Sequence, residues 1–317
     1  SDDQQQQAID AWAKSGAKGG AQRAQHIHDG MIEMYRQSGD PQIAPSSISY
    51  NTVMNAWGKC SDPSPPEMAE KVLEDMLEWD SDLVKTDAIT FSTLMDTYAR
   101  SNRTDSARRA EELFESMDEL GVKRNVFTFS ALQNVYARSG QPNAPKLSMK
   151  VLHRMLELSS NGDMFATPNC VNYNAVLNAY SRTPCRESAS QAAAMLTLME
   201  TPVEEGGFEV EPDRLSYALT ILACSRCPDA SFGARISEAN LEKMEARARI
   251  EAQKREEVSS AAPPSVSLDI ECFNVVLTAI SRSRQRDATD RMIEIITRME
   301  EYAKAGFKYV RPNLRSW

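Results

Sequence analysis

The hydrophobic positions between residues 88 and 125 follow the period of two consecutive α-helices. One face of a first helix is marked by the spacing i, i+3, i+4 and i+7 of Phe91, Leu94, Met95 and Tyr98. The polar segment 101–105 interrupts the pattern, and a second apolar stripe then contains Ala107, Ala110, Leu113, Phe114 and Met117. Gly121 fits the position after a helix, where a positive φ favours glycine. Because neither helix can bury its stripe alone, the segment predicts a hairpin that is stable only when copies of it stack.

Copies of this hairpin pattern recur along the chain. An aromatic residue opens each expected first helix, at Tyr50, Phe91, Phe129, Tyr173, Tyr217 and Phe273. A methionine lies near the end of each expected second helix, at Met31, Met76, Met117, Met155, Met199, Met244 and Met299. Counted from Gln5 in the first copy, the interval between the two positions is 26 residues in six copies and 27 in one. The connections vary from 12 to 29 residues, which is typical of rigid helix pairs joined by loops of variable length.

These intervals predict a single solenoid over residues 1–317 without a second kind of domain. The complete repeats are expected at 47–87, 88–125, 126–169, 170–213, 214–269 and 270–313, the fifth with a long insertion. Residues 1–46 are expected to form a partial repeat and 314–317 to begin another, so the sequence is interpreted as a fragment truncated at both ends. Within the insertion, the charged segment 245–257 predicts that the second helix extends into solvent, until 259–265 breaks it.

Composition narrows the classes of function. The chain has no run of 18 apolar residues, which predicts that it has no membrane span and no membrane partner. Its net charge of −9 argues mildly against a nucleic-acid partner, although an average says nothing about how the charge is distributed.

No pattern in the sequence predicts catalysis. Cys224 and Cys227 form a lone CxxC pair, and without two further ligands we expect them in the core and not on a metal. His26 and His28 point to different faces of a helix and are interpreted as structural or surface residues. There is no phosphate-binding loop and no nucleophile–histidine arrangement. We therefore expect no enzyme, no cofactor, no metal and no small-molecule substrate.

The two ends of each repeat resemble the pentatricopeptide repeat family. Openings such as YNTVMNAWGK and FSTLMDTYAR carry this resemblance, as do the endings Pro45-Ser46, Pro168-Asn169, Pro212-Asp213 and Pro312-Asn313. The resemblance covers essentially the whole chain, with longer hairpins and connections than the family pattern. It implies an all-α, right-handed α-solenoid of stacked helix-turn-helix repeats that binds single-stranded RNA in a mitochondrion or plastid. It also implies RNA-processing or ribosomal proteins as further partners.

The resemblance further implies that two residues of each repeat recognise one base. The first follows the opening aromatic, and the second ends the repeat. The pairs are Asn51 with Asp87, Ser92 with Asn125, Ser130 with Asn169, Asn174 with Asp213, Ala218 with Asp269, and Asn274 with Asn313.

By resemblance these pairs imply the bases U, A, A, U, an undefined base, and C or U, in 5′ to 3′ order. Ala218 leaves the fifth base undefined because its side chain forms no hydrogen bond, and Gln6 with Ser46 is assigned no base. A second interpretation of these short polar residues is that they are N-caps, which would require no RNA.

The family also holds each base with an apolar side chain two residues before the aromatic. Five repeats fit this base-clamping pattern, with Ile48, Ile89, Phe127, Val171 and Leu215, whereas Glu271 departs from it. The alternative is that these side chains belong to the core between repeats.

A further signal does not depend on the resemblance. Nine residues after each opening position the chain is basic in seven of seven copies, although Lys and Arg are 36 of 317 residues. We name this set the basic ladder and expect it to contact phosphates: Lys14, Lys59, Arg100, Arg138, Arg182, Arg226 and Arg282. The alternative is that each cation complements the carbonyls at a helix C-terminus.

A second function stays open at this point. A protein-interaction scaffold of the same fold fits the net charge of −9 and the irregular connections. An enzymatic domain beyond residue 317 is a third possibility.

Overall fold

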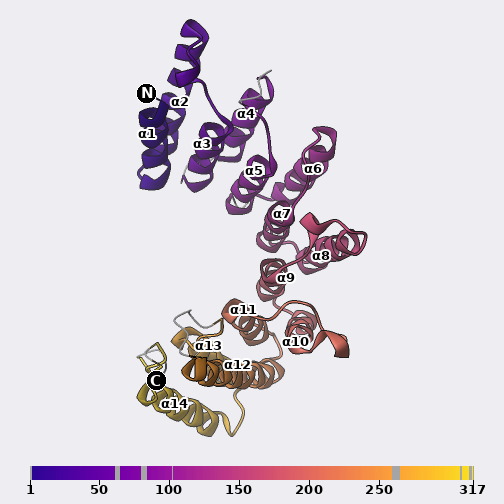
Figure 1. Ribbon diagram of the computed structural model, residues 1–317. Helices are drawn as coiled ribbons and strands as arrows, with labels where there is room; N and C mark the ends of the chain where they lie inside the picture. The colour runs from indigo at the N-terminus through magenta and orange to yellow at the C-terminus, as the bar shows by residue number, and fades with distance from the viewer. Residues whose placement is uncertain are drawn as a thin grey trace. The chain divides into compact units, whose positions relative to one another are not determined.

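The computed structural model describes residues 2–60, 65–79, 84–101, 103–258, 265–307, 309–313 and 316. Throughout these residues the regular secondary structure is helical, without a β-strand (Figure 1). The all-α repeat class expected from the periodicity is therefore confirmed. The predicted repeat start at 314–317 lies outside the described residues, apart from Ser316.

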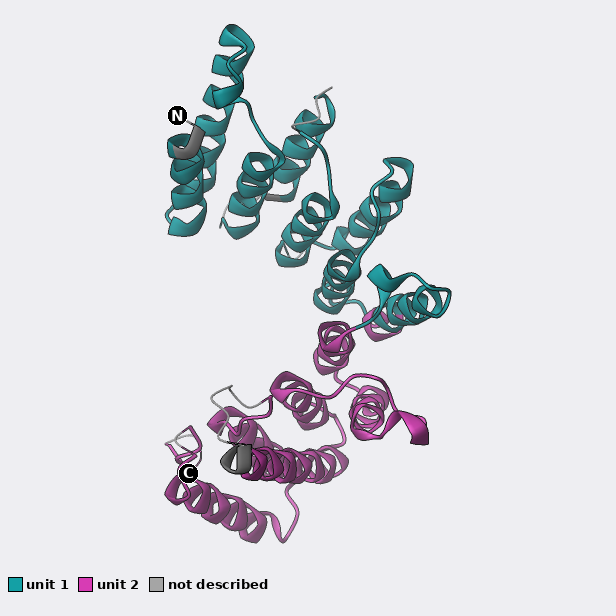
Figure 2. Ribbon diagram, in the orientation of Figure 1, with its two compact units in different colours: residues 1–141, 147–168 teal, residues 142–146, 169–317 magenta. Residues whose placement is uncertain are grey.

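The chain divides into two compact units, each of which is a stack of helix pairs (Figure 2). The first unit comprises residues 1–141 and 147–168, and the second comprises 142–146 and 169–317. Whether the two form the single solenoid expected from the sequence stays a prediction.

In the first unit, first and second helices alternate along the chain. The helices are α1 (Asp2–Ser15), α2 (Gly20–Ser38), α3 (Ser47–Lys59), α4 (Pro65–Leu77), α5 (Ala88–Arg100), α6 (Ser106–Glu119), α7 (Val126–Arg138) and α8 (Ala144–Ser160), of which residues 147–160 belong to this unit. Helices α1, α3, α5 and α7 pack side by side, and α2, α4 and α6 each contact the following first helix (Figure 1). Short 3₁₀ helices lie in two connections, at Pro41–Ile43 and Met164–Ala166.

The second unit repeats this arrangement. Its helices are α9 (Cys170–Arg182), α10 (Arg186–Glu200), α11 (Arg214–Ser225), α12 (Ala230–Val258), α13 (Ile270–Ser283) and α14 (Ala288–Lys304), with a 3₁₀ helix at Val203–Glu205. Helix α11 packs between α9 and α13, while α10 contacts α11 and α12 contacts α13. In both of these pairs, the first helix is covered by the second helix of the preceding repeat.

The repeated aromatic and methionine positions form the cores of the two units. The six opening aromatics are at most 2% exposed and the seven methionines at most 3%. Phe114 of α6 meets Phe129 of α7 edge-on, with ring centroids 5.1 Å apart, so one repeat packs its second helix against the next. Gly121 follows α6 with φ +68°, as expected for a residue that ends a helix in the left-handed region.

Helix α12 shows one difference from expectation. It does continue past Met244, to Val258, but its first added turns do not enter solvent. Ala248 is buried, Arg247 pairs with Glu211, and Glu251 accepts hydrogen bonds from Ser265 Oγ at 2.6 Å and the Val266 amide at 3.1 Å. The predicted extension into solvent is wrong for this part because the returning connection packs against it. The predicted break at 259–265 lies outside the described residues, apart from Ser265.

The cysteine pair and the histidines take structural positions. Cys224 and Cys227 are both fully buried, and burial raises the pKa of Cys224 to about 12. His28 is 1% exposed and meets Tyr50 edge-on at 4.3 Å, whereas His26 is exposed. Over the described ranges, no group of three or more His, Cys, Asp or Glu side chains could hold a metal, and no helix is long and apolar enough to cross a membrane.

Candidate functional site

Residues of the second predicted base-reading set cap the first helices. Five of them immediately precede α5, α7, α9, α11 and α13, and each side-chain oxygen accepts a hydrogen bond from a backbone N–H of the first turn: Asp87, Asn125, Asn169, Asp213 and Asp269. Asp87 Oδ1 accepts from the Thr90 amide at 2.9 Å, and Asn125 Oδ1 accepts from the Phe127 and Thr128 amides at 3.0 and 3.2 Å. The capping interpretation is therefore correct for the local structure of these residues.

Capping does not exclude base recognition, because it uses one of two terminal atoms. At Asn125 both bonds to backbone amides end on Oδ1, so Nδ2 takes no part in the cap. The second atom is a donor in asparagine and an acceptor in aspartate. Since the two residues cap helices about equally well, the choice between them changes hydrogen-bond character at little cost to the helix.

The first base-reading set lies one turn inside the same helices. Ser92 Oγ donates to the Ile89 carbonyl at 3.1 Å, and Ser130 Oγ donates to the Val126 carbonyl at 2.8 Å. Asn51 and Ala218 are half-buried, while Asn174 and Asn274 are only 5% and 7% exposed. The hydroxyls thus bond to their own helices, and the two asparagines of the second unit are embedded among side chains.

The structure brings one predicted pair into direct contact. Asn174 Nδ2 donates to Asp213 Oδ1 at 3.1 Å, across the two neighbouring first helices α9 and α11. Burial opposes ionisation of Asp213, but the hydrogen bonds that it accepts from Ser216 and Asn174 hold its pKa below the usual range. A donor amide and an ionised carboxylate therefore stand side by side. The two residues of the predicted pair Ser130 and Asn169 lie in different units, the first in α7 and the second at the start of α9.

The fifth repeat differs from the others. Asp269 Oδ1 accepts from the Cys272 amide at 2.9 Å, and Oδ2 forms an ion pair with the guanidinium of Arg214. Both carboxylate oxygens are engaged, and the paired position is Ala218. This repeat therefore presents neither a polar first residue nor an unengaged carboxylate oxygen.

The predicted clamping residues are exposed to solvent. Ile48, Ile89 and Phe127 are 68%, 60% and 73% exposed, and Val171 and Leu215 are 58% and 47% exposed. The alternative interpretation, that these side chains belong to the core between repeats, is wrong because each is exposed to solvent. Large apolar side chains are exposed in the first turn of the first helices, each three residues before the first base-reading residue of its repeat. Glu271 is exposed in the corresponding place of α13.

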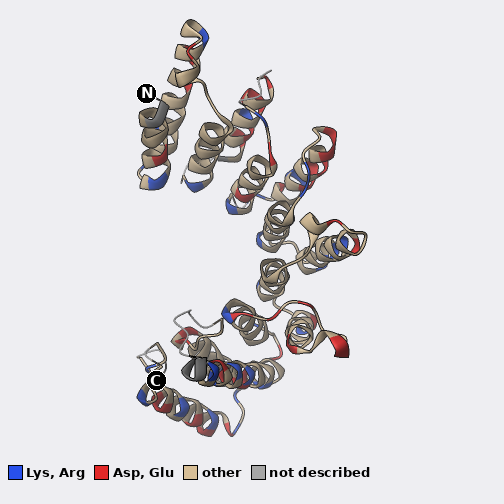
Figure 3. Ribbon diagram, viewed as in Figure 1, with Lys and Arg blue, Asp and Glu red and all other residues tan. Residues whose placement is uncertain are grey.

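All seven residues of the basic ladder are exposed at the C-terminal ends of first helices. Figure 3 shows Lys or Arg at these ends in α1, α3, α5 and α7. The alternative that these cations cap helix C-termini is correct for three of them. Each donates a hydrogen bond to a carbonyl at the end of the preceding first helix: Arg100, Arg226 and Arg282, at 3.5, 2.9 and 2.7 Å. Ladder residues lie eight positions after the first base-reading residue, about 12 Å along the helix.

Carboxylates lie close to some residues of the basic ladder. Lys14 lies 3.9 Å from Asp10. Burial raises the pKa of Asp96, and the nearby cations Arg100 and Arg138 act in the opposite direction. Every residue of the basic ladder is a cation, but nearby carboxylates reduce the positive charge around some of them.

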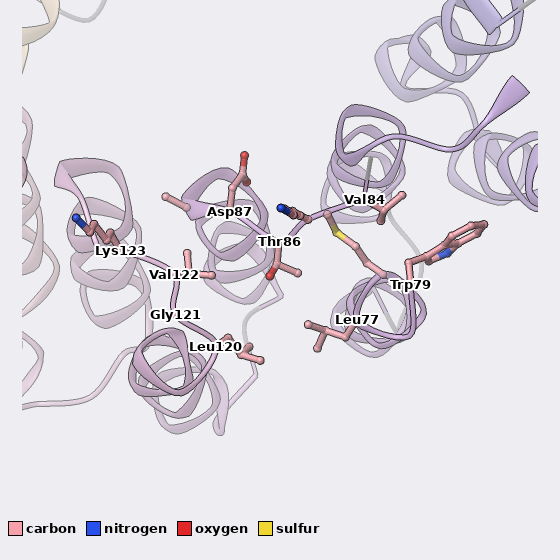
Figure 4. Close-up of a pocket in the computed structure, with 12 residues that line it drawn as sticks. Leu77, Trp79, Val84, Thr86, Asp87, Leu120, Gly121, Val122 and Lys123 are labelled. Atoms are coloured by element: carbon pink, nitrogen blue, oxygen red, sulfur yellow. The ribbon is translucent and has the colours of Figure 1, made fainter. Parts of the chain in front are cut away.

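A hollow in the first unit was not predicted from the sequence. It has a volume of about 680 Å³ and lies between the connections that lead into α5 and α7 (Figure 4). Leu77 and Leu120 line its apolar side, and Asp87 belongs to its lining. Lys85 and Lys123 line it as well, each two residues before a base-reading residue. Their matching places in two repeats were the sequence signal that could have identified them.

Comparison with known proteins gives the following similarities. The family model for the pentatricopeptide repeat domain matches residues 71–139 and 112–183. The crystal structure of the pentatricopeptide repeat protein PPR10 from maize is similar with a TM-score of 0.56 and 19% identity, over 98% of this chain and 35% of that one. The chain thus spans about a third of the length of the maize protein, and the likeness concerns the fold.

A second structure of PPR10, in complex with an 18-nt psaJ RNA element, aligns with a TM-score of 0.42 and 20% identity, over 98% of this chain and 42% of that one. No curated protein matches the sequence.

Proposed function

The chain is a pentatricopeptide repeat protein, and from this premise we propose that it binds single-stranded RNA, one base to each complete repeat. The observation that carries the proposal is the row of exposed apolar side chains, such as Phe127, in the first turn of five first helices. Unpaired bases present flat apolar faces, and RNA-binding proteins recognise them by stacking and by hydrogen bonds to their edges. A binding surface for bases therefore combines apolar side chains with hydrogen-bonding groups.

Hydrogen-bond character supports the assignment of bases. Asn174 carries an amide N–H donor and Asp213 a carboxylate acceptor, and the two side chains are hydrogen-bonded to each other through Asp213 Oδ1. The edge of uracil presents carbonyl acceptors and the N3–H donor, so the two edges are complementary. Ser92 with Asn125 carries a hydroxyl and an amide, which can both donate and accept, as the adenine edge requires. The sequence has the same two groups at Ser130 and Asn169. The proposed RNA reads U-A-A-U, an undefined base, then C or U.

The basic ladder supplies the sequence-independent part of the proposed affinity. Its seven cations are exposed at equivalent places although the net charge is −9. Contact with phosphates would make the affinity fall with salt. The proposed action is occupancy of a short RNA segment, without catalysis or a cofactor, in a mitochondrion or plastid. Protection of the RNA, or its presentation to RNA-processing or ribosomal proteins, would follow from such occupancy.

Equilibrium binding to a short RNA that contains UAAU tests the proposal, with a scrambled RNA as the control and two salt concentrations. Selective binding that weakens with salt is the expected result. Binding without selectivity would support phosphate contact by the basic ladder and contradict the base assignments. No binding at either salt concentration would contradict the proposal and favour a scaffold whose exposed apolar row takes a peptide.

A further inference from the structure

We infer that Ser216 and Ser316 orient the side-chain amides of Asn174 and Asn274 and thereby determine which base these asparagines accept. The inference rests on the proposed function and concerns positioning residues, because the serines act through the asparagines. Each serine belongs to the repeat that follows its asparagine, 42 residues further along the chain.

The same hydrogen bond occurs in both places. Ser216 Oγ donates to Asn174 Oδ1 at 2.7 Å, and Ser316 Oγ donates to Asn274 Oδ1 at 2.7 Å. The two asparagines are 5% and 7% exposed, so their amides are not free to rotate in solvent. Two independent repeats therefore hold the amide oxygen in the same way.

At Asn174 the orientation of the amide is determined at both ends. Asp213 Oδ1 lies 3.1 Å from Nδ2, and an ionised carboxylate only accepts hydrogen bonds, so this contact favours the orientation in which the nitrogen faces Asp213. The oxygen is then left to face the hydroxyl of Ser216. Nδ2 also lies 3.6 Å from Cys170 Sγ, a weak acceptor that a base carbonyl could replace. The amide is thus held ready as a donor.

A held donor separates uracil from cytosine. Uracil has the carbonyl O4 where cytosine has the amino group N4, and the two have opposite hydrogen-bond character. Nδ2 can donate to O4 but meets a second donor at N4. If the amide turned over, Oδ1 would accept from cytosine instead. Serine opposes this reversal because it keeps Oδ1 engaged on the protein side.

The repeat 47–87 shows the arrangement without such a serine. Thr90 occupies the corresponding place, and its hydroxyl lies 3.0 Å from Asp87 Oδ1. Ser216 makes the same contact with Asp213 Oδ1, at 3.1 Å, so the two repeats differ only in the bond to the asparagine. Asn51 Oδ1 is buried and has no hydrogen-bond partner among the described residues. Asn274 Nδ2 is likewise buried and has no hydrogen-bond partner among the residues that the structure describes. An unpaired buried donor is costly, and a base carbonyl would relieve that cost.

The test compares the affinity of the chain for RNA with uracil or cytosine at the fourth position of UAAU. The ratio of the two dissociation constants is measured for the wild type and for Ser216→Ala. We expect the preference for uracil to fall by about fivefold, the factor that one neutral hydrogen bond contributes. Discrimination at the second position, which Ser92 and Asn125 would read, should stay as in the wild type.

Ser49→Ala is the matched control for the loss of a capping hydroxyl. Ser49 Oγ donates to the Ser46 carbonyl at 2.8 Å in the capping box of α3, so this variant loses a comparable local bond. It should leave the preference at the fourth position unchanged. If Ser216→Ala does not fold, Ser316→Ala provides the same test at the sixth position, where the preference should move toward cytosine.

The outcomes separate the inference from the proposed function. Wild-type selectivity in Ser216→Ala would overturn the inference and leave RNA recognition intact. An equal loss of affinity at every position would show a purely structural role and would also overturn it. If the wild type did not bind RNA, the proposed function and the inference would fall together.

Discussion

Arg226 Nη1 donates a hydrogen bond to the carbonyl of Ser181 at 2.9 Å, so a residue of the basic ladder caps the first helix of the preceding repeat. Arg282 makes the equivalent bond to Ser225 at 2.7 Å. These guanidiniums have further N–H donors, and they remain exposed. One cation can therefore bind a carbonyl and a phosphate together, which unites the two interpretations of the ladder.

Reversal of charge at Arg100 and Arg138 should weaken RNA binding and its dependence on salt. Each phosphate contact to a single strand contributes about 0.7 to the slope of log affinity against log salt concentration, so Arg100→Glu with Arg138→Glu should reduce the slope by about 1.4. Titrations of RNA at several salt concentrations measure this change. Fold stability is the control, since both side chains are exposed. An unchanged slope would exclude these residues from phosphate contact.

Phe127 and Phe129 form a matched pair for the clamping surface. They are two residues apart in α7, but Phe127 is 73% exposed and Phe129 is fully buried. Phe127→Ala should lower RNA affinity by about 5- to 100-fold, because a base loses its stacking partner, with little change in stability. Phe129→Ala should instead destabilise the fold by about 3–5 kcal/mol.

Chemical denaturation and RNA titration of both variants separate the two roles. Equal effects of the two substitutions on stability would contradict the structure, and normal RNA affinity in Phe127→Ala would contradict the clamp.

The fifth repeat should show no preference among bases, and Ala218 is only part of the reason. Arg214 engages Asp269 Oδ2, so Ala218→Asn alone should create little preference at the fifth position. Ala218→Asn combined with Arg214→Ser should create a preference for uracil, because the carboxylate is then available. Binding to four RNAs that differ only at that position measures the effect. A full preference in the single variant would show that the ion pair yields to RNA.

The buried His28 should make the first unit sensitive to acid. Burial lowers its pKa to about 4 from the ordinary 6.5, although Asp29 acts in the opposite direction. The pKa of His28 is lower in the folded protein than in the unfolded chain. The neutral side chain therefore makes its full contribution to stability above pH 6.5, and this contribution is lost as the pH falls toward 4. The expected loss between about pH 7 and about pH 5 is about 2 kcal/mol.

Denaturant unfolding at these two pH values measures this loss, and His28→Leu should remove most of it. His26→Leu, at an exposed position of the same helix, is the control and should leave the pH dependence as in the wild type. An identical pH dependence in His28→Leu would assign the effect to other groups.

Much of the fold could be predicted from the sequence because the repeated pattern is strictly local. The stripe that contains Phe91 and Tyr98 has a helical period, and both side chains are buried. Asp87 and Gly121 mark helix ends by preferences of single residues. Local signals of this kind do not depend on how repeats pack.

Other features could not be predicted because they join residues that are distant in the chain. The pair Arg214 and Asp269 and the bond from Ser216 to Asn174 depend on the offset between neighbouring repeats. An apolar residue such as Phe127 fits either core or surface by its pattern, and only its exposure decides. The return of the chain against α12, at Val266, likewise depends on tertiary packing.

The most direct test of the central claim compares the wild type and the variant Asn125→Asp against two RNAs. Asn125→Asp keeps the capping oxygen and replaces the donor Nδ2 by an acceptor, so the helix should be preserved. Affinities of both proteins are measured for UAAU and UGAU. The wild type should prefer UAAU, and the variant should prefer UGAU. The same order of preference in both proteins would contradict base recognition by this repeat.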